Sequence, residues 1–386
     1  MSPANPDNNI SWRFIEPLDV LFLRGNQHFG APGSYGESMV PPWPSVAAGA
    51  LRSSILARDG VDLAAFSQGK QAHPELGTPA DPGSFLLQSF QLGRKHSDGS
   101  VEQLFPLPAD LVVTQGETDG MPQATGITSL RPVALHAGIS TSSSLPQLAV
   151  LAQSGRSKPA SGWWLRQRGW ERYLQGAPLD ADDVEHASRL WRFDERVGIG
   201  LNADTRSAED GKLFTVRALA MSAGIGFISG TSGARAPENT TLRLGGDGRG
   251  ARVSGIRLET PEPDYGALLQ AGRCRIVLTS PGLFAGGWQL PGMDTNSQLL
   301  VLPGLRARVV AAALSRAETI SGWDLAQQCP KPAMKAASAG SVYWLEDLES
   351  SADALRKLVT HGLWMDPCED TARRAEGFNR FSFATY

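Results

Sequence analysis

Short apolar runs separated by glycine and proline dominate the pattern of hydrophobic and polar positions along this chain. In the first half, runs typical of strands occur at 12–16, 84–92 and 110–113. Each run is shorter than an average helix and is bounded by Gly, Pro or Ser, which favours strands over buried helices. The pattern therefore predicts many strands joined by irregular loops.

One segment of the first half has helical spacing instead. In VAAGALRSSILAR, which follows the proline-rich turn PPWPS, Ala47, Leu51 and Ile55 recur every four residues and form one apolar stripe. Arg52 is expected on the other side of this helix. Ser45 is expected to be its N-cap, because a serine hydroxyl can accept a hydrogen bond from a free amide of the first turn.

The second half has a more regular order of elements. Strands are predicted at 273–280, 307–314 and 341–346, followed by a helix at 348–362 and a last strand in FNRFSFATY. With a degenerate helix in GGWQLPGMDTNSQLL, this order is the βαββαβ of a ferredoxin-like unit, a scaffold that also underlies the RNA-binding RRM sheet. The first half fits the same order and ends with TLRL, GGDGRG and ARVSGI. We therefore predict an α+β fold of two tandem ferredoxin-like domains, at 10–262 and 270–386.

Two segments of the first domain do not fit that order. The stretch 114–180 has little regular pattern and is predicted to be a loop-rich insertion. The stretch 195–219 alternates charged, apolar and small residues around a polar tip, which predicts a protruding β-hairpin. Such a hairpin is either an arm that packs on a neighbouring subunit or one that also inserts apolar or guanidinium groups between RNA bases. Stacking of that kind stabilises by ~1 to 3 kcal/mol per base.

Composition and charge exclude several classes of protein. Hydrophobic residues make up 41% of the chain and charged residues 19%, which is ordinary for a globular protein. The formal net charge is −3, so any RNA site has to be a local basic patch and not a global basic field. No basic start with an apolar run opens the chain, and no stretch approaches the roughly 18 apolar residues of a membrane span. We therefore expect a cytoplasmic protein without a membrane partner.

Cysteine and histidine spacing predicts no metal site and no cofactor. Cys274, Cys329 and Cys368 form no C-x-x-C pair, and the six histidines form no H-x-x-x-H or H-E-x-x-H. His28, in RGNQHFG near Arg24, is the one histidine with the surroundings of a general base for cleavage at a 2′-hydroxyl. A plain RNA contact and a loop histidine without a role are its alternatives, and we expect no enzyme.

The turn GGDGRG, at 245–250, has the glycine density of a phosphate-binding loop. Glycine allows backbone amides to approach an anion closely. No Lys-Ser or Lys-Thr follows, so the turn is not a P-loop. A tight hairpin turn explains the pattern as well as an RNA backbone contact does, while Arg249 and Arg252 favour RNA.

Several blocks of the sequence resemble one known family in their order along the chain. FIEPLDVLFLRGNQHFG followed by PPWPSVAAGALRSSIL resembles the opening of the RAMP-superfamily subunit that caps the crRNA 5′ end in type III-B (Cmr) CRISPR effector complexes. ERVGIGLNADTRSAEDGKLF is similar to that family's thumb hairpin, RLGGDGRGARV to its first glycine-rich turn, and KPAMKAASAGSVYWLE to the strand pair before its last helix. The C-terminal turn departs from the pattern, since Asn379 stands where many RAMP proteins keep a glycine.

The resemblance implies a non-catalytic RNA-binding subunit in antiviral defence. Such a subunit holds the 5′ tag of the crRNA, bridges the large Palm-domain (Cas10-type) subunit to a neighbouring RAMP backbone subunit, and meets target RNA indirectly. Three alternatives remain: a crRNA-processing RAMP endoribonuclease, the equivalent capping subunit of another type III complex, and a scaffold whose contacts are all with protein. Carried over by position, the RNA-binding residues are Arg24, His28, Ser45, Arg52, Arg196, Ile199, Asn202, Arg206, Gly245, Gly246 and Arg249.

Overall fold

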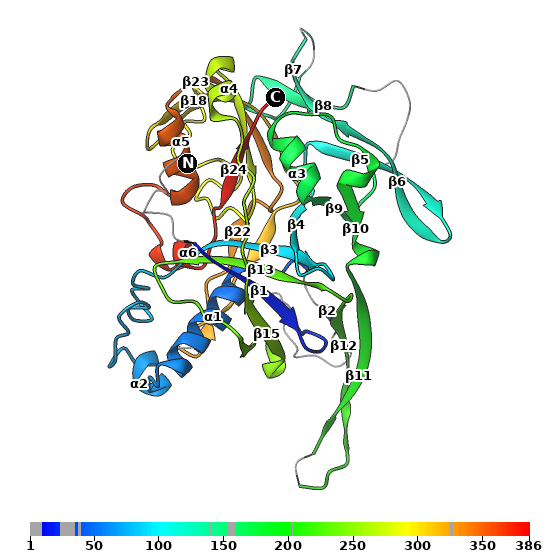
Figure 1. Cartoon of the computed structure of the whole chain (residues 1–386), viewed down its shortest axis with the longest axis vertical. Helices are drawn as coiled ribbons and strands as arrows, with labels where there is room; N and C mark the ends of the chain where they lie inside the picture. The colour runs from blue at the N-terminus through cyan, green and yellow to red at the C-terminus, as the bar shows by residue number, and fades with distance from the viewer. Residues whose placement is uncertain are drawn as a thin grey trace.

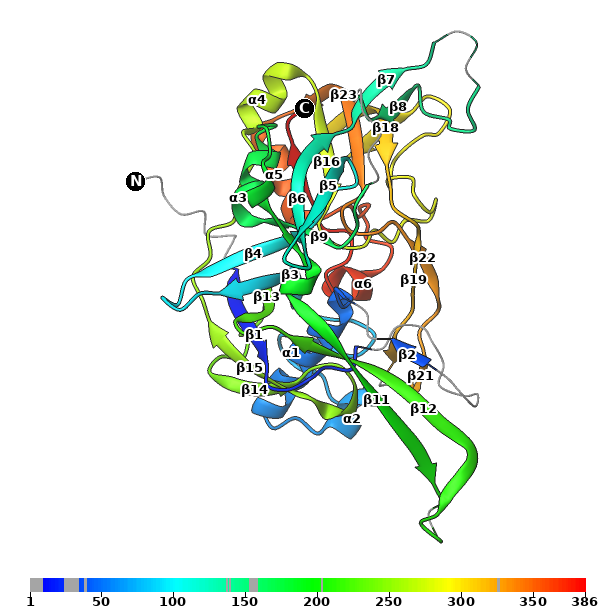
Figure 2. The same cartoon turned by 90° about the vertical axis from the view of Figure 1, so that its right-hand side faces the viewer.

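The computed structural model of the chain describes residues 10–23, 35–37, 40–136, 138, 140–152, 159–202, 204–324 and 327–386. Helices and strands are mixed along these residues, and the strands of the two larger sheets pair antiparallel. The predicted α+β class is therefore confirmed. The two larger sheets form the body of the molecule, and one long hairpin extends away from them (Figures 1 and 2).

The first sheet has eight strands in the order β10-β9-β4-β3-β13-β1-β15-β14. These strands are β1 (Ser11–Pro17), β3 (Leu86–Lys95), β4 (Val101–Pro106), β9 (Trp163–Arg166), β10 (Val184–His186), β13 (Ile225–Ser232), β14 (Thr240–Arg243) and β15 (Gly250–Gly255). Strand β1 lies between β13 and β15, with Phe14 opposite both Ile228 and Ser254. The centre of the sheet therefore joins the first strand of the chain to strands more than 200 residues later.

Helix α1 (Pro44–Arg58) packs on this sheet against β3 and β14, and the short helix α2 (Leu63–Ser67) follows it (Figure 1). The predicted apolar stripe is confirmed, because its three residues are fully buried. The predicted N-cap is wrong. Trp43 takes that position without a side-chain cap bond, Pro44 begins the helix, and Ser45 lies inside the first turn. Proline suits this position because its missing N–H would have no partner within the helix.

The second sheet has five strands in the order β17-β18-β23-β16-β24. They are β16 (Cys274–Leu278), β17 (Leu299–Leu302), β18 (Leu305–Ala313), β23 (Val342–Ser350) and β24 (Phe381–Ala384), with helix α5 (Ala352–His361) between the last two. The strands and the helix predicted for the second half are confirmed. The degenerate helix predicted in residues 286–300 is wrong, since this stretch holds turns, bridges and the start of β17. Helix α4 (Tyr265–Ala271) instead precedes β16 and packs on α5.

The stretch 114–180 contains more regular structure than its pattern predicted. Strands β5 (Leu111–Thr118) and β6 (Met121–Ser129) form one hairpin, β7 (Arg131–Ala134) and β8 (Gln147–Val150) form another, and helix α3 (Gln167–Leu174) follows β9. The described part of this stretch therefore combines two hairpins, a strand and a helix with the predicted loops. Two-stranded hairpins bury few side chains, so their alternation of apolar and polar positions is weak.

The long hairpin consists of β11 (Trp191–Leu201) and β12 (Ala208–Met221). Their register runs from Trp191 opposite Met221 to Ile199 opposite Leu213. The predicted protruding segment 195–219 covers most of both strands and the tip between them, and β2 (Tyr35–Glu37) pairs parallel with β12. Figure 2 shows the hairpin projecting beyond both sheets, so most of its length lies free of the body of the molecule.

A shared apolar core joins the two sheets. Phe105 and Trp163 from the first sheet belong to the same buried cluster as Val277, Val310 and Trp344 from the second. Smaller elements complete the fold: β19 (Glu318–Ile320) with β22 (Met334–Ala336), β20 (Trp323–Asp324) with β21 (Cys329–Pro330), helix α6 (Thr371–Ala375), and the 3-10 turns at 181–183, 187–189 and 246–248. In the part of the chain described, no helix is long and apolar enough to cross a membrane.

Candidate RNA interface

The segment Leu21–Leu23 connects two of the predicted RNA-binding elements. Leu21 and Leu219 exchange both backbone hydrogen bonds at 2.8 Å, which fixes the segment to the root of the hairpin β11–β12. The carbonyl of Phe22 accepts a hydrogen bond of 2.7 Å from the amide of Gly246, which fixes it to the glycine turn. The chain leaves this point toward Arg24 and His28, and both of these predicted contacts lie outside the described residues.

The glycine turn is a tight connection between β14 and β15. Gly245 has φ +74°, and a Cβ atom there would lie 2.7 Å from the carbonyl oxygen of Phe22, so any larger residue would push the segment away. Arg249 donates to Asp19 at 2.7 Å, and its guanidinium lies 4.9 Å from the centre of the Phe22 ring. The sequence analysis assigned Arg249 to RNA contact, which stays a prediction; within the chain its guanidinium is held by a carboxylate and an aromatic ring.

The start of helix α1 contributes less exposed charge than predicted. Arg52 donates to the carbonyl of Leu76 at 3.4 Å, and its guanidinium lies 5.9 Å from the centre of the Phe85 ring. Burial lowers the pKa of Arg52. The expectation that Arg52 stands free on the polar side of the helix is wrong, because the chain after α2 covers that side. Contact of Ser45 and Arg52 with RNA stays a prediction.

The tip of the hairpin is ordered by the side chain of Asn202. Its carboxamide oxygen accepts from the amides of Asp204 and Thr205, each at 3.0 Å, and its backbone carbonyl accepts from the amide of Arg206 at 2.9 Å. Arg206 has φ +53° and an exposed side chain. Asn202 therefore acts within the described structure as the residue that closes the turn and presents Arg206 to solvent.

One face of the hairpin is an exposed apolar strip, which we define as Val197, Ile199, Leu201 and Leu213. Val197 and Ile199 alternate along β11, and Ile199 lies opposite Leu213 on β12, so these three share a face; Leu201 continues the strip beyond a shift in the register of the two strands. Their side chains are 48–69% exposed. Apolar side chains gathered in this way on a projecting element are typical of a surface that binds a partner.

The hairpin carries no formal net charge. Its residues 191–221 contain Arg192, Arg196, Arg206, Lys212 and Arg217 against Asp194, Glu195, Asp204, Glu209 and Asp210. Several of these pair within the hairpin, as Arg196 does with Asp194 at 2.8 Å. The contribution of the hairpin to binding is therefore expected to come from apolar contact and stacking, with little dependence on salt.

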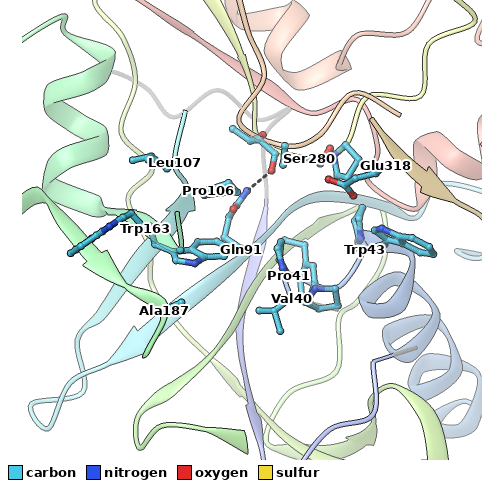
Figure 3. A pocket seen from close by; sticks show the side chains of 18 of the residues that line it. Val40, Pro41, Trp43, Gln91, Pro106, Leu107, Trp163, Ala187, Ser280 and Glu318 are labelled. Carbon is cyan, nitrogen blue, oxygen red and sulfur yellow. Dashed lines mark hydrogen bonds between the residues drawn. The ribbon is translucent and has the colours of Figure 1, made fainter. Parts of the chain in front are cut away.

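A pocket of about 550 Å³ lies at the junction of the two sheets (Figure 3). Gln91 on β3 and Thr279 after β16 meet at its wall, where the Gln91 amide donates to the Thr279 carbonyl at 3.0 Å. Its lining comes from Val40, Pro41, Pro42, Trp43, Pro44, Phe90, Gln91, Pro106, Leu107, Ala160, Ser161, Gly162, Trp163, Trp164, Ala187, Trp191, Thr279, Ser280, Pro281, Glu318 and Ala339. Sequence reasoning missed this pocket, although the high density of Pro and Trp in PPWPS was a signal for it.

Comparison with known families identifies the class of protein first. Residues 13–381 match the model of a family described as CRISPR-associated protein (Cas_Cmr3), which is nearly the whole chain. The chain is therefore a CRISPR-associated protein. More particularly, it belongs to the Cas_Cmr3 family. This agrees with the family that the order of the sequence blocks indicated.

Two solved structures are similar to the chain at low identity. One is a chain of the structure described as "Cryo-EM structure of the Type III-B Cmr-beta bound to cognate target RNA and AMPPnP, state 1"; it is 14% identical, the match covers 86% of both chains, and the TM-score is 0.45. The other comes from "Cryo-EM structure of the Type III-B Cmr-beta bound to cognate target RNA", with 14% identity, 96% of both chains covered and a TM-score of 0.49. No curated protein matches the chain.

Proposed function

We propose that this chain is the subunit of a type III-B CRISPR effector complex that holds the 5′ tag of the crRNA. Membership of the Cas_Cmr3 family supports the assignment to such a complex. The observation that carries the RNA site is the convergence at Leu21–Leu23, where the root of the hairpin, the glycine turn and the chain leading to Arg24 meet. The crRNA tag would lie across this junction.

The physical character of the junction suits single-stranded RNA. Single strands are held by backbone amides, arginine planes and stacking, and not through a duplex groove. The glycine turn would allow backbone amides to approach a ligand closely, the Arg249 guanidinium lies 4.9 Å from the centre of the Phe22 ring, and the hairpin presents Ile199 and Arg206. The net charge of −3 is compatible with this mode because stacking needs no general basic field.

The apolar strip of the hairpin supports protein partners as well. We propose that the chain bridges the large Palm-domain subunit and a neighbouring RAMP backbone subunit in the cytoplasm, and that it meets target RNA indirectly. Burial of the four exposed aliphatic side chains of this hairpin against a protein surface would remove apolar area from water, which is favourable. Contact with a neighbour and insertion between bases can both use this hairpin, along different parts of its length.

We also propose that the two sheets are tandem ferredoxin-like units. Numbered in chain order, β1, β3, β13 and β15 have the spatial order 2-3-1-4, and so do β16, β18, β23 and β24. An antiparallel sheet with this order is expected of a βαββαβ unit. Each unit keeps one of its two helices, α1 in the first and α5 in the second.

The chain is proposed to be non-catalytic, so purified protein is expected not to cleave repeat RNA with or without a divalent metal. Among the described histidines, His73 is held by Asp59 at 3.1 Å and His186 by Ser188 at 2.8 Å, so both have structural roles. The measurement is a time course of labelled repeat RNA at excess substrate. Multiple-turnover cleavage that disappears in His28→Ala would favour the processing endoribonuclease.

Removal of the stacking groups of the hairpin is expected to reduce discrimination between a tagged guide and a scrambled one. In Ile199→Ala and Arg206→Ala, the preference should fall about 5- to 160-fold, which corresponds to the loss of ~1 to 3 kcal/mol for one stacked base. The salt dependence of affinity should change little, because the hairpin has no net charge. The measurement is RNA affinity of the assembled complex at several salt concentrations.

Matched control variants make this test specific. Val301 on β17 is as exposed as Ile199, and Arg306 on β18 is an exposed arginine with a loose ion pair of 3.9 Å. Val301→Ala and Arg306→Ala are expected to keep full discrimination. If the hairpin variants bind both guides like the unmodified protein, the tag lies elsewhere and the proposed site is wrong.

A further inference from the structure

The pocket at the junction of the sheets has an acidic lining, which is unusual for an RNA-binding subunit. Among the described residues that line it, Glu318 carries the sole charge, and the others are mostly proline, tryptophan and small residues. Without a lysine or arginine in this lining, the pocket offers no favourable place for a phosphate group. It therefore differs in chemistry from the interface at the glycine turn.

Glu318 lies on the short strand β19, and Figure 3 shows its carboxylate beside Trp43 at one side of the pocket. No ion pair joins it to a lysine or arginine in the described part of the chain. Hydrogen bonding by the Trp43 indole and the Ser338 hydroxyl offsets only part of the hydration that this mostly buried carboxylate loses, and no cation supplies the rest. Burial accordingly raises the pKa of Glu318. The carboxylate is thus suited to a cation that arrives from outside the chain.

The aromatic lining indicates which kind of cation suits the pocket. Trp43, Trp163 and Trp191 come from three different segments and line the same space, so a planar group could lie against an indole while it bonds to the carboxylate. A guanidinium is planar, stacks on aromatic rings and can donate two parallel hydrogen bonds to one carboxylate. An ammonium is a compact, strongly hydrated charge and fits such a site less well.

We propose that this pocket binds an arginine side chain carried by a protein partner. The volume of about 550 Å³ is larger than one guanidinium needs and leaves room for the residues on either side of it. The five prolines of the lining are rigid and keep the pocket open without a ligand, which lowers the entropic cost of binding. This interaction goes beyond the proposed crRNA contact, because it requires no nucleic acid.

The test uses the full chain and two small probes of the same shape, of which one carries a guanidinium and the other a neutral ureido group. N-acetyl-arginine amide is titrated while the indole N–H signals of the tryptophans are followed by NMR, with Trp43→Phe as the assignment variant. Saturable shifts are expected at the pocket tryptophans, whereas N-acetyl-citrulline amide, the neutral isostere, should give none. Affinity for the arginine probe should fall at least about tenfold in Glu318→Gln and on acidification through the raised pKa of Glu318.

The control variant is Glu349→Gln, which alters an exposed carboxylate on β23 and should bind the probe normally. Thermal melting of Glu318→Gln checks that the variant is folded. Its affinity for tagged RNA should be unchanged. Arginine binding is thus tested separately from RNA binding, and this proposal can be wrong while the proposed function is right. Equal binding of both probes, absence of saturable shifts, or full arginine affinity in Glu318→Gln would overturn the proposal. Tighter binding of adenosine than of the arginine probe, insensitive to Glu318→Gln, would assign the pocket to a base instead.

Discussion

Replacement of Asp110 by alanine is expected to lower the free energy of unfolding by about 3–5 kcal/mol, because it leaves a buried guanidinium without its carboxylate. Asp110 is fully buried and accepts from Arg275 at 2.5 Å and from the Tyr173 hydroxyl at 2.9 Å. Arg275 also donates to the carbonyl of Thr385 at 2.6 Å. One carboxylate thus holds together the start of β5, helix α3, strand β16 and the C-terminal residues.

The measurement is urea unfolding of Asp110→Ala, followed by circular dichroism. The matched control is Glu349→Ala, which breaks the exposed pair with Arg306 and is expected to cost less than about 1 kcal/mol. The double variant Asp110→Leu with Arg275→Met should be more stable than Asp110→Ala, because it removes the whole pair and leaves no buried charge. An Asp110→Ala variant as stable as the control would mean that Arg275 is solvated in the folded protein.

The elements that sequence reasoning predicted correctly are those whose signal is local. The stripe of α1 and the strands of the second sheet follow from periodicity within about ten residues, and the turn between β14 and β15 follows from its glycines. The wrong predictions concern features that tertiary contacts determine. Pro44 begins α1 one residue before Ser45, and Leu76, more than 20 residues after Arg52, accepts from that arginine.

The candidate site shows the same division. Its two local parts, the hairpin and the glycine turn, could be predicted from the sequence, since each is a continuous segment. Their convergence at Leu21–Leu23 could not, because it depends on a bridge between residues about 200 positions apart. Contacts between residues far apart in the sequence also produce the pairing of Arg249 with Asp19 and assemble the pocket from several separate segments. Pairing across such distances leaves no periodic trace in a single sequence.

A second buried arginine, Arg380, is expected to differ from Arg275: replacing Arg275 should lower the free energy of unfolding, whereas replacing Arg380 should not. Arg380 precedes β24 and is 4% exposed, yet among the described residues its one side-chain hydrogen bond goes from Nη1 to the carbonyl of Thr360, at 2.8 Å. Its Nε and Nη2 atoms are buried without a partner. Burial and, second, repulsion by Arg374 lower the pKa of Arg380 to about 9, which shows that the charged form is disfavoured there.

Arg380→Met is therefore expected to leave the free energy of unfolding unchanged or to raise it by about 1–4 kcal/mol, since methionine fills similar space without a charge. The neighbouring Asn379 should keep the local backbone in place, because its side chain accepts from the Leu283 amide at 2.6 Å and donates to the Leu363 carbonyl at 3.0 Å. Urea unfolding compares Arg380→Met with Arg275→Met, which leaves Asp110 unpaired and should cost about 3–5 kcal/mol. If both variants lose stability equally, the guanidinium of Arg380 is compensated and its burial is favourable.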